Sequence, residues 1–244
     1  MPIDKTVASF AGAVSDIPDG ATVMIGGFGG AGGMPHLLML ALRDHGARNL
    51  TIVSNTAGIA APTGFGWPPG MTPVDHAVLI DNGQVAKVIA SFPVSGSVSR
   101  PNAFETAFRA GKIVLEVVPQ GTLAERMRAA GAGIPAFYTA TSFGTPLAEG
   151  KEQREFAGRQ YVMEEALHGD VALIEAWQAD RWGNLTYRAT GRNFNPVMAA
   201  AAKLTVVQTQ HVVELGALDP EAIVTPGVLV DRVLHVPYGD PASF

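Results

Sequence analysis

The stretch Gly26-Gly-Phe-Gly-Gly-Ala-Gly-Gly-Met-Pro35 follows five residues that are typical of a buried strand, Ala21–Ile25. Pro35–Arg43 is typical of an apolar helix with a proline in its first turn, where the missing N–H does no harm. This arrangement places backbone N–H groups and a positive helix end around a concavity that suits a phosphate or a carboxylate. Two interpretations stay open: ligand contact, or a glycine turn that lets the strand and the helix pack closely.

The segment Gly27–Gly32 also matches the G-x-G-x-x-G pattern of dinucleotide-binding folds. That pattern requires an acidic residue near the end of the second strand, which here is Leu50–Ser54. No Asp or Glu lies between Asp44 and Asp75, so the sequence argues against a nicotinamide dinucleotide.

Composition excludes several classes of function. The 244 residues carry a formal net charge of -5 without a basic run, which argues against nucleic acid as a partner. The absence of cysteine removes a thiol nucleophile and thiolate metal ligands, and the six histidines are scattered, so no metal site is expected. No apolar block is long enough for a signal peptide or a membrane span, and we therefore expect a soluble cytoplasmic protein.

Strand and helix patterns alternate along the chain. The predicted strands are Ala21–Ile25, Leu50–Ser54, Val85–Ser91, Ile113–Val118, Ala136–Thr139, Val171–Ala176, Leu204–Gln208 and Val228–Val236. The predicted helices are Thr6–Val14, Pro35–Arg43, Asn102–Ala110, Thr122–Ala130 and Asn195–Lys203, with a small hairpin at Arg154–Met163. This alternation predicts an α/β fold, a largely parallel sheet with helices on both faces. We expect a single domain over residues 1–236 and an irregular tail over 237–244.

Boundary signals accompany several of these elements. Gly46 is placed to stop the second helix, and Asn102 and Asn195 are placed as N-caps. The spacing of Thr122 and Glu125 fits a capping box. The Gly- and Pro-rich segment Ala60–Pro73 is predicted to be a long loop.

Ligands of such sheets gather beyond the carboxyl ends of the strands. Two amide side chains are expected there: Asn55 after the second strand, and Gln120 in the turn Pro119–Gly121. An amide NH2 group can stabilise an oxyanion, but both residue types are also common in turns and caps. No G-x-S-x-G elbow is present, and the residues alone indicate a ligand-binding domain without a nucleophile of its own.

Several long motifs in this order resemble the A subunit of family I coenzyme A transferases. They are Gly26–Gly29, Ser54–Gly58, Val118–Arg126, Gly131–Tyr138, Gly183–Arg188, Arg192–Asn195 and Thr225–Arg232. The resemblance extends from about Thr6 to Val236.

The resemblance implies transfer of CoA from an acyl-CoA, usually succinyl-CoA, to a 3-oxo acid by a ping-pong mechanism. It implies that the attacking glutamate belongs to a separate B subunit, most simply in an α2β2 heterotetramer. Coenzyme A would then be a substrate, and no permanently bound cofactor is expected.

The resemblance also assigns roles to particular residues. Gln120 would donate to the oxyanion of the tetrahedral intermediates, and Asn55 would line the same cleft. The glycine loop would contact CoA, or would instead shape the acyl pocket and the subunit contact. The loop residues concerned are Gly26, Gly27, Phe28, Gly29, Gly30, Ala31 and Gly32.

The acceptor is predicted from Ala90–Lys112 and Asp180–Tyr187, which resemble the 3-oxoadipate subgroup more than the acetoacetate subgroup. Arg100 and Arg109 are candidates for binding the far carboxylate of such an acceptor, or are simply surface charges. The alternatives are an acetoacetate CoA-transferase subunit, an acyl-CoA hydrolase subunit, and a non-catalytic ligand-binding domain on the same fold.

Overall fold

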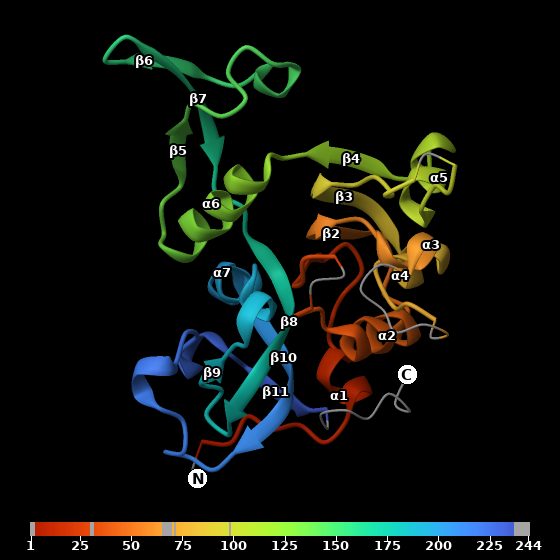
Figure 1. Cartoon of the computed structure of the whole chain (residues 1–244), viewed down its shortest axis with the longest axis vertical. Helices are drawn as coiled ribbons and strands as arrows, with labels where there is room; N and C mark the ends of the chain where they lie inside the picture. The colour runs from red at the N-terminus through yellow and green to blue at the C-terminus, as the bar shows by residue number, and fades with distance from the viewer. Residues whose placement is uncertain (1–2, 30–31, 65–69, 71, 98, 237–244) are drawn as a thin grey trace.

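The computed structural model describes residues 3–29, 32–64, 70, 72–97 and 99–236. Its centre is an eight-stranded sheet in which seven parallel strands have the order β11-β10-β8-β1-β2-β3-β4, and the short β9 pairs antiparallel with β8 (Figure 1). The strands are β1 Thr22–Ile25, β2 Leu50–Thr56, β3 Val85–Phe92, β4 Val114–Val117, β8 Gly169–Asp180, β9 Leu185–Thr186, β10 Ala202–Val213 and β11 Arg232–His235.

Helices cover both faces of this sheet, which confirms the predicted fold class. The α-helices are α1 Phe10–Val14, α2 His36–His45, α3 Ala60–Thr63, α4 Ala77–Asp81, α5 Ala103–Arg109, α6 Gln120–Gly131 and α7 Asn195–Ala201. Short 3-10 helices span η1 Pro146–Ala148, η2 Ala189–Arg192, η3 Pro220–Ala222 and η4 Gly227–Leu229. Alternate residues of the central strands point to opposite faces, so Ile25 joins a core with α2, and Met24 joins a second core with α6 and α7.

A second sheet projects from the body in Figure 1. It is antiparallel, with the order β5-β7-β6, and it comprises β5 Ala136–Thr139, β6 Gln153–Phe156 and β7 Arg159–Glu165. The predicted hairpin is confirmed, because Ala157 and Gly158 both have positive φ at its tip, as a tight hairpin turn requires. The strand predicted at Ala136–Thr139 is also confirmed, but it belongs to this sheet and not to the parallel one.

Two of the predicted helix boundaries are confirmed by their hydrogen bonds. Gly46 ends α2 in the left-handed conformation, and its N–H donates to the carbonyl oxygen of Leu42. Asn102 caps α5 in a reciprocal capping box with Glu105.

The predicted helix start at Thr6 is wrong. Thr6 pairs with Val233 in a parallel bridge, where the N–H of Val7 donates to the Val233 carbonyl, and α1 begins only at Phe10, capped by Ser9. This pairing supplies partners to the outer edge of β11, which would otherwise expose unpaired backbone groups.

Two predicted elements near the C-terminus are shorter than the sequence indicates. The last strand is predicted from Val228, but Gly227–Leu229 forms η4, and β11 begins at Arg232. The helix predicted to end at Lys203 ends at Ala201, and β10 follows without a loop.

The predicted loop Ala60–Pro73 is only partly irregular. Its first four residues form α3, and α4 follows shortly after it. Phe65 and Trp67 lie outside the described residues, as does the predicted tail 237–244.

The capping box predicted at Thr122 is also wrong. The helix α6 begins two residues earlier, where the N–H of Leu123 donates to the carbonyl oxygen of Pro119. Thr122 is 3% exposed, its hydroxyl has no hydrogen-bond partner, and Glu125 pairs instead with Arg128.

This position yields a stability prediction. Thr122→Val should raise the free energy of unfolding by about 0.5–1 kcal/mol, because it removes a buried unpaired hydroxyl at nearly constant volume. Urea unfolding of both proteins measures the difference. A loss of stability in the variant would show that the hydroxyl makes a favourable interaction that its surroundings do not reveal.

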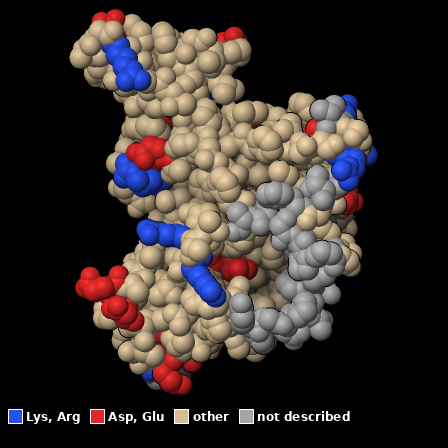
Figure 2. Space-filling view, in the orientation of Figure 1, with Lys and Arg blue, Asp and Glu red and all other residues tan. Residues whose placement is uncertain are grey.

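The face shown in Figure 2 is largely uncharged, in keeping with a chain in which 16% of the residues are charged. Basic side chains occur on the projecting sheet, and acidic side chains gather toward the opposite end. Within the described residues, no helix has the length and apolar character needed to cross a membrane.

Candidate active site

The two predicted amide side chains meet at the carboxyl edge of the parallel sheet. Asn55 lies on β2, one residue before the end of that strand, and Gln120 is the first residue of α6. The Nε2 of Gln120 donates to Oδ1 of Asn55 over 2.8 Å. Asn55 is 4% exposed and Gln120 is exposed, so a buried amide holds an accessible one in place.

This hydrogen bond determines which N–H group of Gln120 remains free to donate to a ligand. Because one Nε2 hydrogen of Gln120 is used by Asn55, the second is left for another acceptor. The N-terminus of α6 has no side-chain cap, so its first-turn N–H groups and its positive dipole end lie beside the Gln120 amide. Neutral donors at a positive helix end are suited to stabilising a developing oxyanion.

The glycine loop packs against the segment before α7. A Cβ atom at Gly26 would overlap the side chain of Asn195, and one at Gly33 would overlap the backbone of Gly191. The N–H of Gly27 donates to Oδ1 of Asn193 over 3.0 Å. At these positions, close packing accounts for the absence of side chains.

Other loop positions remain more accessible. Phe28 is 40% exposed and stacks on Phe194 at 6.2 Å between ring centroids, and the space around Gly32 is open. Gly29 has a φ of +59, with Ile59 beside it. Gly30 and Ala31 lie outside the described residues.

Asn195 does not cap α7 as predicted, because it is already the first helical residue. Its side chain is fully buried and bonds to the glycine loop instead. Its Nδ2 donates to the carbonyl oxygens of Gly33 and Gly191, and its Oδ1 accepts from the N–H of Glu175. No local sequence signal indicates this role, which depends on a loop 162 residues away in the chain.

The N-terminus of α2 is already provided with an acceptor. The sequence leaves ligand contact as one of two open interpretations for this helix end, and here Oε1 of Gln208 accepts from the N–H groups of Leu37 and Leu38 at 3.1 and 3.3 Å. The Nε2 of Gln208 in turn donates to Glu175 over 2.9 Å. The amide of Gln208 therefore links the N-terminus of α2 to the carboxylate of Glu175. The positive end of the helix is thus served by groups of the protein itself.

Glu175 is a site residue that no sequence motif singles out. It accepts from both Gln208 and Gln210, and burial raises its pKa to about 7. It lines a cavity of about 280 Å³ together with Gly32, Gly33, Trp177, Arg188 and Gln210. The sequence contains one signal for this role: Glu175 is a charged residue within the apolar run of β8, and such residues are rarely buried unless they are paired.

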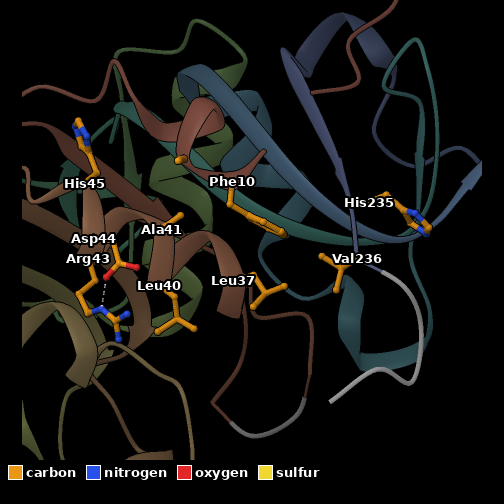
Figure 3. A pocket seen from close by; sticks show the side chains of 10 residues that line it. Phe10, Leu37, Leu40, Ala41, Arg43, Asp44, His45, His235 and Val236 are labelled. Atoms are coloured by element: carbon orange, nitrogen blue, oxygen red, sulfur yellow. Dashed lines mark hydrogen bonds and ion pairs between the residues drawn. The ribbon is translucent and has the colours of Figure 1, made fainter. Parts of the chain in front are cut away.

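A larger cavity, of about 550 Å³, lies between α1, α2 and the end of β11 (Figure 3). Phe10, Leu37 and Leu40 line it, and its Arg43 and Asp44 form an ion pair with each other. None of the predicted site residues that the structure describes lines this cavity.

The charged candidates lie elsewhere. Arg109 ends α5 just before β4 begins, at the amino edge of the sheet, where it pairs with Glu105 and is 64% exposed. Arg100 is exposed. Among the described residues, no three or more His, Asp or Glu side chains form a group that could hold a metal ion.

A comparison with known protein families identifies the family of this chain. Residues 7–235 match the profile of a protein family described as Coenzyme A transferase. The chain belongs to the coenzyme A transferase family. The resemblance drawn from the sequence motifs is therefore confirmed.

Two relatives within this coenzyme A transferase family are similar over nearly their whole length. The chain is 53% identical to the A subunit of the 3-oxoadipate CoA-transferase of Pseudomonas putida, over 96% of this chain and 94% of the relative. It is 46% identical to the A subunit of a probable succinyl-CoA:3-ketoacid coenzyme A transferase of Bacillus subtilis (strain 168), over 94% and 89%.

Solved structures of coenzyme A transferases share the fold. An acyl-CoA transferase from Escherichia coli O157:H7 has a TM-score of 0.79 and 26% identity, over 98% of this chain and 49% of that one. Glutaconate coenzyme A-transferase from Acidaminococcus fermentans has a TM-score of 0.79 at 22% identity, over 96% and 76%, and supports the fold alone.

Proposed function

We propose that this chain is the A subunit of an enzyme that moves CoA from succinyl-CoA to a 3-oxo acid, with 3-oxoadipate as the acceptor. The observation that carries the proposal is the 53% identity to the A subunit of a 3-oxoadipate CoA-transferase along nearly the full length of both chains. The contact between Gln120 and Asn55 supports it, because it assembles oxyanion donors at the edge of the sheet where ligands of this fold class bind.

In the proposed reaction, a glutamate carboxylate from the partner B chain attacks the thioester carbonyl of succinyl-CoA. The tetrahedral oxyanion collapses, CoA thiolate leaves, and a mixed anhydride remains. The thiolate then attacks the glutamyl carbonyl of the anhydride, which releases succinate and forms a glutamyl-CoA thioester. The acceptor carboxylate reverses these two steps and leaves as its CoA thioester.

This chain contributes donors to each of those oxyanions. The second N–H of Gln120 is the proposed donor, and Asn55 holds its amide in one orientation. We place CoA along the accessible side of the glycine loop, near Phe28 and Gly29, because Gly26, Gly27 and Gly33 are engaged by the segment before α7.

The partner is the proposed B subunit, in an α2β2 heterotetramer. The relatives are named as A subunits, and the Gln120–Asn55 pair contains donors without an attacking carboxylate among its own described hydrogen bonds. The B subunit would supply that carboxylate.

Reconstitution tests this function. The purified chain alone should transfer no CoA, and adding a B-type subunit should produce transfer from succinyl-CoA to 3-oxoadipate, followed as formation of the acyl-CoA product. Acetoacetate and water are assayed in parallel, because the Bacillus subtilis relative is named for 3-ketoacids. Preference for acetoacetate, or hydrolysis without an acceptor, would assign the chain to the corresponding alternative. Transfer by the isolated chain would contradict the shared site.

A further inference from the structure

In the described part of the chain, the carboxyl group of Glu175 accepts hydrogen bonds from neutral donors and from no cation. Gln208 donates to Oε2 over 2.9 Å and Gln210 to Oε1 over 3.3 Å. Among the ion pairs formed by the described part of the chain, none involves Glu175. A carboxylate that is largely shielded from water and has no cation is unfavourable, and burial accordingly raises its pKa to about 7.

A second acceptor beside it lacks a donor. Oε1 of Gln210 is buried without a hydrogen-bond partner among the described residues, while its Nε2 donates to Glu175. Both residues line the same cavity of about 280 Å³. The cavity therefore presents a carboxylate that has neutral donors but no cation, and beside it an amide oxygen that has no donor among the described residues.

Neither Arg188, nor the proposed substrates, nor a metal ion is suited to neutralise the Glu175 carboxylate in this cavity. Arg188 lines the same cavity, but its guanidinium stacks over the ring of Trp177 at 4.7 Å. The proposed acyl-CoA and 3-oxo acid substrates bear carboxylates and phosphates, which a carboxylate repels. Metal binding is not indicated, since the described residues contain no group of three or more acidic or histidine side chains that could hold a metal ion.

We propose that this cavity receives a lysine or arginine side chain of the partner subunit when the two chains assemble. The inference rests on the proposed two-subunit function. A cationic nitrogen carries several donors, so one group can bond to the Glu175 carboxylate and to Oε1 of Gln210 together. The cavity includes Gly32 and Gly33, so it lies on the glycine loop that the B subunit would adjoin in completing the active site.

Insertion of a cation has a consequence for pH. It favours the ionised form of Glu175, so assembly lowers the pKa of this carboxyl and releases a proton wherever the free chain holds one. Affinity between the subunits should therefore rise as the pH increases from 6 to 7 and level off near pH 8.

The test measures the dissociation constant of the complex with a B-type subunit, by sedimentation or calorimetry, from pH 6 to 8.5. Glu175→Gln should weaken assembly by about 10- to 100-fold at pH 8 and remove its rise with pH. Gln210→Leu removes the second acceptor and should weaken assembly by about 3- to 10-fold. Glu155→Gln, on the exposed strand β6, is the matched control and should assemble as the wild type does.

Circular dichroism of each free variant verifies the fold. A Glu175→Gln complex with wild-type affinity and wild-type pH dependence would overturn the inference. So would equal loss of affinity in Glu155→Gln, which would indicate a general charge effect. Transferase activity at saturating B subunit tests the proposed function separately, because it does not depend on how tightly the chains assemble.

Discussion

Gln120→Ala is expected to lower kcat of the assembled enzyme by about 10²–10³, the usual effect of removing one oxyanion donor. The reason is local: Gln120 is accessible, begins α6, and has one amide hydrogen left after its bond to Asn55. KM for succinyl-CoA should change much less, because the lost interaction forms mainly in the transition state. Steady-state kinetics with both substrates varied provides the measurement.

Gln153→Ala serves as the control, since Gln153 is an exposed glutamine on the projecting strand β6. Its kcat should equal that of the wild type. If Gln120→Ala retained wild-type kcat with an intact fold, Gln120 would be a structural residue at the start of α6, and the oxyanion donors would lie elsewhere.

Much of the architecture follows from local pattern. The alternation of apolar strands and helices predicts a parallel sheet covered on both faces, because crossover helices between parallel strands must pack on that sheet. Gly46 and the pair Asn102–Glu105 mark helix ends by bonds within a few residues, so the sequence suffices to predict them. The hairpin tip Ala157–Gly158 is likewise determined by neighbouring residues and can be predicted from the sequence.

Two of the errors arise from dependence on distant partners, and the third is local. Ala136–Thr139 is a strand, but nothing in its own residues indicates that it pairs with β7 instead of joining the main sheet. Thr6 is extended because β11, more than two hundred residues later, needs a partner. Thr122 has the spacing of a cap, yet α6 starts earlier at Gln120.

The candidate site likewise has one part that the sequence predicts and one part that depends on distant segments. Asn55 and Gln120 could be expected to converge, because both lie at the carboxyl ends of parallel strands and such strands end at one edge. The hydrogen bonds that connect Glu175, Gln208 and the start of α2 join three segments that are far apart in the sequence. No residue spacing in the sequence predicts them. For this reason the sequence pattern alone leaves ligand contact and close packing as alternatives at that helix end.

Glu175→Gln is expected to stabilise the isolated chain at pH 8. Burial raises the pKa of Glu175 from 4.5 to about 7, so the folded chain binds this proton more tightly than the unfolded chain. The free energy of unfolding therefore falls as the pH rises from about 4.5 to 7, and the full cost persists above pH 7. Glutamine is neutral throughout and avoids that cost.

The expected gain for Glu175→Gln is about 2 kcal/mol at pH 8 and less than about 1 kcal/mol at pH 5. The value at pH 8 lies below the ~3 kcal/mol that the whole pKa difference implies, because the residue is only partly buried. Urea unfolding of the variant and the wild type at both pH values measures the difference. Other titrating groups are common to the two chains and cancel.

The hydrogen bonds of the variant can be largely kept by one amide rotation. The new NH2 group at position 175 needs an acceptor, and turning the Gln210 amide brings its Oε1 to that group. Gln208 keeps its contact through the remaining oxygen at position 175. The rotation moves Nε2 of Gln210 into the buried position that Oε1 now occupies, and the loss of its acceptor is a further reason why the gain stays below the value that the whole pKa difference implies. Glu155→Gln should show no such difference between pH 5 and pH 8. A Glu175→Gln chain less stable than the wild type at pH 8 would mean that the carboxylate is favourable in the free chain, and the cavity would then have no need of a partner's cation.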